Sequence, residues 1–194
     1  MSGSITFLRK ALDSILLKPY FNWHGYLSSA INITLCDSIT STNANFPLTV
    51  TSVNDAPLIV MPKNSLYSAE NEMIISDYIS ISIEDEDMMH SPNLKSTMTV
   101  NITTKFGGKL HMSKFIVGCY VVYPTGKNPS TKIVFRGTIN SINEAFQNLV
   151  FSRNSDYDFL DVITIEVNDE GNFGEGGHLS SLAHINVYST ITEK

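Results

Sequence analysis

Hydrophobic and polar residues alternate along much of this chain. Residues 31–35, 98–102 and 163–167 each place an apolar side chain at every second position. A period of two predicts strands with one face buried and the other in solvent. Shorter apolar runs predict further strands at residues 48–53, 73–75, 79–83, 115–123, 132–135 and 183–188.

A second pattern, with apolar residues mostly three positions apart, occurs twice. The first copy, residues 3–17, carries Ile5, Leu8, Ala11, Leu12 and Ile15. The second copy, residues 137–151, carries Ile139, Ile142, Ala145, Phe146 and Leu149. This spacing predicts a short helix with one apolar face in each copy. In the second copy, Asn140 or Ser141 is predicted to cap the start of the helix.

The chain is predicted to divide near residues 54–57, Asn-Asp-Ala-Pro. Pro57 cannot continue a helix, and it holds the residue before it in an extended conformation. We therefore predict a partial unit over residues 1–55, a complete unit over 56–190 and a tail over 191–194.

The repetition at a fixed offset, from Gly3 to Gly137, indicates a tandem array of repeats, each with one short helix. Since the first copy begins at Gly3, the chain is expected to be a segment of a longer protein. Many short strands separated by turn signals predict an all-β fold, an immunoglobulin-like β-sandwich. Four glycines in residues 171–177 predict a mobile loop between two strands.

The composition narrows the class of partner. Charged residues make up 16% of the chain, below the roughly 25% of an average protein, and the net charge is −6. No basic cluster is present, so nucleic acid is not expected as a partner. The sequence has no run of 18 apolar residues, so no membrane-spanning helix is predicted. Any membrane contact is expected through regions outside this segment.

Carboxylates and asparagines gather where predicted strands end. Residues 84–87, Glu-Asp-Glu-Asp, close one strand, and residues 168–169, Asn-Asp, close another. Strand ends of an antiparallel sandwich can meet at one pole, and calcium takes six to eight oxygen ligands of these kinds. The predicted calcium ligands are Asn54, Asp55, Asp85, Asp87 and Asp169. Considered alone, the acidic run is equally consistent with a solvated turn.

Several stretches resemble the tandem repeats of the cadherin-like family. Residues 53–57, Val-Asn-Asp-Ala-Pro, resemble its linker signature, residues 69–72 its early acidic position, and residues 81–87 its Asp-x-Asp segment. Residues 135–151 resemble the Gly-Thr and short-helix stretch of the long cadherin-like repeats found in large surface adhesins. Residues 163–172 are similar to the penultimate strand and loop of that family.

The resemblance implies a Greek-key β-sandwich whose repeats join through calcium, within a large extracellular or cell-surface protein. It implies a calcium-binding adhesion or structural segment, in which calcium stiffens the junction between repeats. The implied junction ligands are the five residues named above, and calcium is the implied cofactor. Glu70 would serve the opposite pole, together with Asp156 and Asp158. The implied partners are neighbouring repeats of the same chain and other surface proteins or glycans.

Two departures from the family pattern point to fewer ions than in a cadherin. Asn22 and His24 stand where the second unit has Asp156 and Asp158. Residues 189–193 lack the Asn-Asp-Ala-Pro linker, so the next junction is expected to lack calcium, or the array to end there.

A calcium-independent module that binds carbohydrate or protein is the alternative function. Trp23 lies near Tyr20, Phe21 and Tyr26 in the sequence. Such a group forms either a sugar-binding platform or, more often, the packed base of a sandwich. The alternative predicts that these aromatic side chains are exposed and that the protein is indifferent to calcium.

No catalytic set is evident, and an enzyme is not expected. The five histidines are scattered, and no Gly-x-Ser-x-Gly nucleophile motif occurs. Cys36 and Cys119 leave open either a disulfide or two separate thiols. Asn32 and Asn101 each begin an Asn-x-Thr sequon, which is a glycosylation signal only in a secreted eukaryotic protein.

Overall fold

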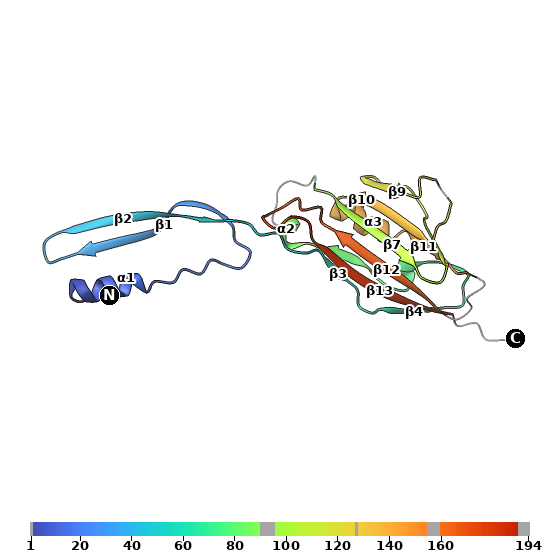
Figure 1. Ribbon diagram of the computed structural model, residues 1–194, viewed down its shortest axis with the longest axis horizontal. Coiled ribbons are helices and arrows are strands. Elements are labelled where there is room, and N and C mark those ends of the chain that lie inside the picture. Colours follow the sequence, from blue (N-terminus) through green and yellow to red (C-terminus); the bar gives the residue numbers. More distant parts are fainter. Residues whose placement is uncertain (1, 90–95, 127, 155–159, 190–194) are drawn as a thin grey trace. The chain divides into compact units, whose positions relative to one another are not determined.

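The computed structural model describes residues 2–89, 96–126, 128–154 and 160–189 (Figure 1). The chain divides into two compact units, Met1–Ser52 (unit 1) and Val53–Lys194 (unit 2). Asn54 and Asp55 therefore belong to unit 2. The predicted tail 191–194 lies outside the described residues, and so do Asp156 and Asp158.

Unit 2 is a β-sandwich, and its larger layer is a six-stranded sheet. In order across the sheet, its strands are β4 (Ser65–Ser68), β13 (Ser180–Ser189), β12 (Leu160–Asn168), β7 (Met98–Thr104), β10 (Lys132–Gly137) and β9 (Cys119–Tyr123). All neighbours are antiparallel except β4 and β13, which run parallel. Neighbours such as β4 and β13 are distant in sequence, as the predicted Greek-key connections require.

The second layer combines two small sheets and short helices. One sheet has the order β5 (Glu72–Ile74), β11 (Leu149–Ser152) and β8 (Lys109–Met112), and the other pairs β3 (Leu58–Val60) with β6 (Ser82–Glu84). The helices are η1 (Ile75–Asp77), α2 (Glu86–Met89) and α3 (Ile139–Phe146). The prediction of one short helix per unit is thus wrong for unit 2, because the acidic run winds into α2.

The predicted alternation sets the core of the sandwich. In β12 the inward residues Ile163, Ile165 and Val167 are fully buried, and in β7 so are Val100 and Ile102. Buried side chains of both layers form one continuous cluster. The predicted strand at 79–83 is wrong in its extent, since β6 covers only Ser82–Glu84, although Ile79 and Ile81 are buried. An apolar run reports burial more reliably than it reports backbone conformation.

The helix α3 begins two or three residues earlier than predicted. Thr138, not Asn140 or Ser141, is the N-cap, and its hydroxyl oxygen accepts the backbone N–H of Ser141. Leu149, predicted on the helix face, is instead the first residue of β11. The error arises because both the last turn of a helix and the start of a buried strand carry apolar residues.

Unit 1 repeats the second half of this arrangement. Its helix α1 (Ile5–Asp13) is capped by Ser4, whose Oγ accepts the N–H of Phe7. Ser4 and Thr138 occupy the same position in the two copies, so both helices start with the same side-chain cap. The strands β1 (Gly25–Cys36) and β2 (Ser41–Val50) form an antiparallel hairpin, as β12 and β13 do.

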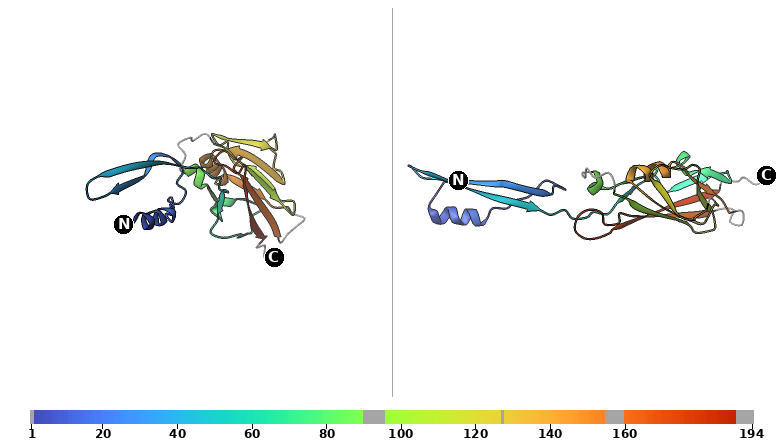
Figure 2. Two further views of the ribbon diagram at one scale, coloured as in Figure 1. Left: turned by 60° about the vertical axis from the view of Figure 1, so that its left-hand side comes forward. Right: turned by 90° about the horizontal axis from the view of Figure 1, so that it is seen from above.

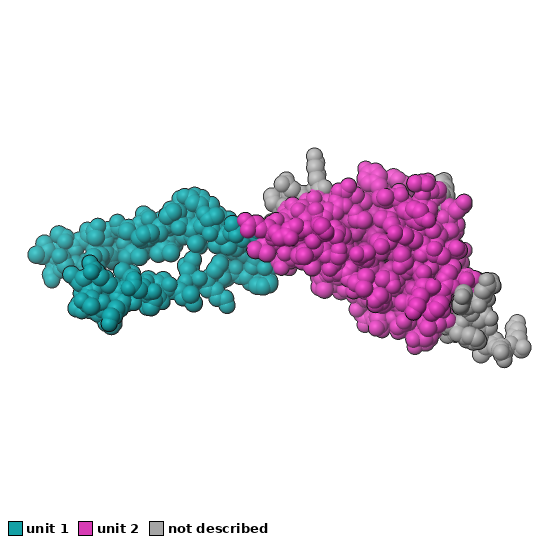
Figure 3. All heavy atoms as spheres, viewed as in Figure 1, with its two compact units in different colours: residues 1–52 teal, residues 53–194 magenta. Residues whose placement is uncertain are grey.

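Unit 1 lacks the layer that buries these elements in unit 2. No described residue of 2–52 is buried. Leu12 is 42% exposed, whereas Phe146, its counterpart in the repeat, is 1% exposed. The helix lies along one side of the hairpin in Figures 1 and 2. In Figure 3 the atoms of unit 1 enclose open gaps, whereas those of unit 2 form a filled body.

Unit 2 is expected to fold without unit 1, because its core contains only its own residues. Deleting residues 1–52 should change the free energy of unfolding of unit 2 by no more than about 0.5 kcal/mol, as for changes away from a core. Urea unfolding of the truncated and full chains, followed by far-UV circular dichroism, measures the difference. Loss of cooperative unfolding after truncation would contradict this expectation.

Candidate functional site

The five predicted calcium ligands lie together at one end of unit 2, which we call the acidic pole: Asn54, Asp55, Asp85, Asp87 and Asp169. Asp169 directly follows β12, and Asp85 directly follows β6. Because β3 is antiparallel to β6, pairing Leu58 with Glu84, the segment that enters β3 lies beside the end of β6. The topology thus brings three separate chain segments to one pole.

Asn54 and Asp169 form the buried centre of the acidic pole. Asn54 is 6% exposed and Asp169 is 2% exposed. The side-chain nitrogen Nδ2 of Asn54 donates to Asp169 Oδ2 at 2.5 Å. The same amide nitrogen donates to the carbonyl of Gly177 at 2.8 Å, and the Asn54 N–H donates to the carbonyl of Glu175 at 2.8 Å. Asn54 therefore binds both Asp169 and the glycine-rich loop.

Asp169 also closes that loop at its base. Its Oδ1 accepts the N–H groups of Gly171 and Leu179, both at 2.8 Å. Gly174 has φ +67°, and a Cβ at this position would lie 2.5 Å from the Asn54 nitrogen. Only glycine allows the two backbones to approach so closely. The loop that the sequence predicted to be mobile is held by side-chain and backbone hydrogen bonds.

Alternate residues of the acidic run point toward the acidic pole. Asp85 is 3% exposed and its Oδ1 accepts the Met88 N–H at 3.1 Å, so it caps α2. Asp87 is half-buried, and its Oδ2 accepts the Asp55 N–H at 2.6 Å. Glu84, the last residue of β6, is exposed. The solvated-turn alternative therefore holds for the exposed glutamate but not for Asp85.

The surroundings of Asp85 in the acidic pole disfavour the ionised form of its carboxyl group. Burial raises the pKa of this carboxyl, and the nearby charges of Asp87 and Asp169 raise it further, while the Met88 N–H acts in the opposite direction. Among the described residues, no basic side chain forms an ion pair with Asp85, Asp87 or Asp169. The acidic pole therefore concentrates negative charge that no basic side chain of the described residues pairs with.

The carboxylate and amide oxygens of the acidic pole are ligands that a hard cation binds, but the described residues are not arranged as a complete coordination site. Within residues 2–89, 96–126, 128–154 and 160–189, no three His, Cys, Asp or Glu side chains are placed to hold a metal. Both oxygens of Asp169 already accept N–H groups, as does one oxygen each of Asp85 and Asp87. Calcium would have to use the remaining carboxylate and amide oxygens, with side-chain rearrangement.

Glu70 is not part of the acidic pole. It follows β4, whose end pairs with the last residue of β13, whereas the first residue of β13 pairs with Asn168 beside the acidic pole. Glu70 is exposed, and its N–H donates to Ser68 Oγ at 3.0 Å. The prediction that it lies at the opposite pole agrees with this placement, while its predicted companions are not described.

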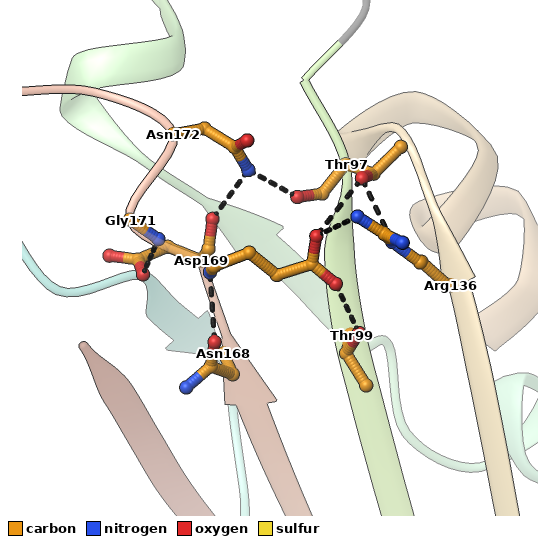
Figure 4. Close-up of polar contacts among 8 residues, drawn as sticks. Thr97, Thr99, Arg136, Asn168, Asp169, Gly171 and Asn172 are labelled. Atoms are coloured by element: carbon orange, nitrogen blue, oxygen red, sulfur yellow. Dashed lines mark hydrogen bonds and ion pairs between the residues drawn. The ribbon is translucent and has the colours of Figure 1, made fainter. Parts of the chain in front are cut away.

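A polar network around Glu170, which the sequence analysis missed, supports the acidic pole (Figure 4). Glu170 has φ +60°, a conformation that is uncommon for residues other than glycine. Its carboxylate accepts the hydroxyls of Thr99 at 2.5 Å and Thr97 at 3.2 Å and pairs with Arg136. The network ties β7, β10 and β12 together next to Asp169. The Asn-Asp-Glu-Gly order, typical of a turn, was the available signal.

Asp161 is a second buried carboxylate that the sequence analysis missed. It is 5% exposed, and its Oδ1 accepts the N–H groups of Lys105 and Phe106 at 3.0 and 2.9 Å. Its Oδ2 accepts the Gly108 N–H at 2.8 Å. These bonds fix the turn between β7 and β8, so the role of Asp161 is structural.

The aromatic group of unit 1 is largely exposed, as the alternative function predicts. Tyr20, Phe21 and Tyr26 are 91%, 90% and 65% exposed, and Trp23 is half-buried. They are not the packed base of a sandwich here. Their exposure has the same origin as that of the rest of unit 1, which has no second layer.

The remaining candidate residues have ordinary surroundings. Cys36 is exposed and Cys119 is buried, and both are free thiols. Burial raises the pKa of Cys119 to about 11, so it remains a protonated thiol at neutral pH. Asn32 is exposed, whereas the side-chain amide of Asn101 donates to Glu166 at 3.1 Å. Of the two sequons, Asn32 is the accessible one.

No family model and no curated protein matches this chain. Among solved structures, it is similar to the collagen binding subdomain of the Enterococcus faecalis surface protein ACE, with 7% identity and a TM-score of 0.34, covering 69% of this chain and 98% of that chain. It is also similar to a cohesin module from a Clostridium perfringens family 33 glycoside hydrolase, with 9% identity and a TM-score of 0.34, covering 71% and 99%. No helix among the described residues has the length and apolarity needed to cross a membrane.

Proposed function

We propose that this chain is an adhesion or structural segment of an extracellular or cell-surface protein, built from cadherin-like β-sandwich repeats. In this proposal the acidic pole of unit 2 binds calcium. The observation that carries it is the group Asp85, Asp87 and Asp169, which has no basic partner among the described residues. Bound calcium would supply the positive charge that the described part of the protein does not place against these carboxylates.

The residues of the acidic pole have distinct parts in this function. Asp85 and Asp87 flank Glu86 in the sequence and are both less exposed than it. Asn54 and Asp55 lie on the segment that leads into β3, and the Asp55 N–H donates to Asp87. Asp169 is already bonded to Asn54 and to the loop, so it positions that segment. Neutralising these carboxylates would hold the entering segment against α2, stiffening the chain where the sandwich begins.

Calcium is expected to stabilise the chain through the acidic pole. With a Kd on the order of 10⁻⁴ M and about 1 mM free calcium, the gain in the free energy of unfolding is roughly 1.4 kcal/mol. Thermal unfolding with calcium titrated against chelator measures it. Asp87→Asn should lose most of the gain, and Glu84→Gln, which makes the same charge change on an exposed neighbour, should keep it. An intact chain that melts identically with calcium and with chelator would rule out the calcium function.

In the absence of calcium, Asp85→Asn is expected to stabilise unit 2. The raised pKa means that the folded state binds a proton more tightly than the unfolded state, so stability falls as the pH rises from 3.8 through the folded-state pKa. Asparagine removes that loss and can still accept the Met88 N–H. The variant should therefore have a higher free energy of unfolding than the wild-type chain at pH 7, and the difference should shrink toward pH 3.

Urea unfolding in chelator between pH 3 and pH 8 tests the Asp85 prediction. The wild-type chain should lose more stability than the variant as the pH rises through this range. A destabilised variant, or two parallel pH profiles, would contradict the prediction. Either result would show that the negative charge of Asp85 does not lower the free energy of unfolding of unit 2.

A carbohydrate-binding function is the second candidate, favoured by the exposed rings of Tyr20, Phe21 and Tyr26. Sugar rings stack on exposed aromatic faces, so binding would reside in unit 1 and would be indifferent to calcium. A glycan array probed with the full chain in chelator tests it. Binding that Phe21→Ala abolishes and Asp87→Asn leaves unchanged would favour this candidate.

A further inference from the structure

The turn of the hairpin in unit 1 matches the turn between β12 and β13 in unit 2. The N–H of Asp37, which follows β1, donates to the carbonyl of Thr40 at 3.0 Å, and its Oδ1 accepts the Thr40 N–H at 2.7 Å. Asp169, which follows β12, makes the same two bonds with Leu179, at 3.1 and 2.8 Å. The inward residues of β12 therefore have these counterparts in β1: Ile31 for Ile163, Ile33 for Ile165 and Leu35 for Val167.

The two equivalent strands differ in the number of their neighbours. β12 lies between β13 and β7, and it pairs with β7 in antiparallel register, with Ile165 opposite Ile102. Both of these side chains are fully buried. Among the described residues, β1 pairs with β2 alone, and Leu35 is 55% exposed, whereas its counterpart Val167 is 0% exposed. β1 thus lacks the neighbour that β7 provides in unit 2.

The backbone of β1 faces away from β2 at every second residue. Asp37 bonds across the hairpin, and residues that face the partner alternate with residues that face away along an antiparallel ladder, so Thr34 faces away from β2. The register is unbroken from Ile31 to Cys36, so the same holds for Asn32 and Cys36. We call the backbone of Asn32, Thr34 and Cys36 the open edge of β1. Each of the three has an N–H and a carbonyl that a further strand can bind.

The composition of the hairpin indicates which edge can receive a strand, and of what kind. Proteins protect edge strands with lysine, proline or a bulge. β2 contains Pro47, which cannot donate to a ladder, whereas β1 contains neither lysine nor proline, and its register shift lies outside the open edge, between Leu27 and Ile31. Residues 25–50 contain one charged side chain, Asp37. A charged strand would find no opposite charge along β1, so an uncharged strand fits best.

We propose that the open edge of β1 binds an extended segment of a partner protein, antiparallel to β1, as β12 binds β7. The segment has the character of β7, which is uncharged and alternates polar and apolar side chains, Met-Thr-Val-Asn-Ile-Thr-Thr. Its apolar side chains would cover Ile33 and Leu35, and its backbone would extend the ladder. This interaction belongs to unit 1 and does not depend on calcium at the acidic pole, so either one can fail without the other.

Hydrogen exchange of the full chain, with and without a peptide of residues 97–104, tests the proposal. The peptide carries the β7 sequence and serves as the probe for the partner segment. In its presence the three amides of the open edge should exchange about tenfold more slowly, because they become hydrogen-bonded. A control peptide with Val100→Asn and Ile102→Asn keeps the length and the neutrality but lacks two apolar side chains, and it should leave the exchange unchanged.

Two proline variants locate the contact. Thr34→Pro removes a donor from the open edge, and Asn45→Pro removes one from the outer side of β2, where Asn45 lies opposite Asn32. Thr34→Pro should weaken binding of the peptide, measured at the amides of Asn32 and Cys36, by about tenfold, and Asn45→Pro should leave it unchanged. Slow exchange of the Leu35 amide, which faces β2, confirms that each variant keeps the hairpin.

The outcomes that overturn the proposal are equally specific. The first is a peptide that leaves the open edge unprotected, and the second is equal binding by Thr34→Pro and Asn45→Pro. The third is protection of the open edge without peptide that increases with the concentration of the chain, because the occupant is then β1 of a second copy. Faster exchange at the β12 amides, with the open edge unchanged, would show that the peptide displaces β7 from unit 2, and it likewise contradicts the proposal.

Discussion

Replacing Phe146 by alanine is expected to lower the free energy of unfolding of unit 2 by about 3–5 kcal/mol. The ring is 1% exposed and packs edge-on against Phe135, with centroids 5.9 Å apart. It joins α3 to the six-stranded sheet, so its removal leaves a cavity between two layers that the surrounding strands cannot close. The expected loss is a large part of the stability of a domain of this size.

The internal repeat supplies a matched control for this substitution. Leu12→Ala changes the equivalent position of α1, but Leu12 is 42% exposed and has no second layer above it. Its effect should be below about 1 kcal/mol. Urea unfolding followed by far-UV circular dichroism, with hydrogen exchange at the β12 amides, compares the two variants. Equal losses would mean that the helix of unit 1 is packed as tightly as α3.

Asp161→Ala is expected to cost about 3–5 kcal/mol, because it removes the carboxylate that accepts the N–H groups of half-buried Phe106 and buried Gly108, whereas the Lys105 N–H keeps the Val162 carbonyl as an acceptor. The carboxylate accepts the N–H groups of Lys105, Phe106 and Gly108 within 3.0 Å. Hydrogen bonds to a charged group contribute about 1.5–3 kcal/mol each, and an unsatisfied buried donor costs its full desolvation. The turn between β7 and β8 should open first.

Two variants calibrate the Asp161 result. Asp161→Asn keeps one carbonyl oxygen and should lose an intermediate amount, whereas Asp77→Ala, at an exposed site in η1, should change stability by about 0.5 kcal/mol or less. Urea unfolding gives the free energies, and hydrogen exchange at Gly108 reports the turn directly. If alanine at position 161 is tolerated as well as alanine at 77, the carboxylate does not hold the turn.

The local pattern of the sequence determined the strands and helices whose burial is one-sided. Alternation at 98–102 and 163–167 placed β7 and β12 and their inward faces, because side chains of a strand point to opposite sides at every step. The three-residue spacing placed α1 and α3. The same pattern could not separate Leu149 from α3 or Ile79 from β6, since apolar runs mark burial in either conformation.

The acidic pole was predicted from composition at strand ends, and the structure brings its five residues together. What the sequence could not give is which oxygens are already used. Asp169 is a hydrogen-bond acceptor for Asn54 and for two loop amides, and this depends on backbone groups far away in the chain. The calcium function therefore stays a proposal, while the position of the pole is a property of the fold.

Other features depend on the tertiary structure alone. The apolar side chains of β9 stay exposed because β9 is the last strand of its sheet, and the order of strands is not visible in any local pattern. The exposure of α1 and the burial of α3 differ although their apolar spacing and side-chain caps match, since only unit 2 supplies a second layer. The sequence determined which faces are apolar, and the tertiary structure decided which of them are covered, because burial depends on neighbours distant in the chain.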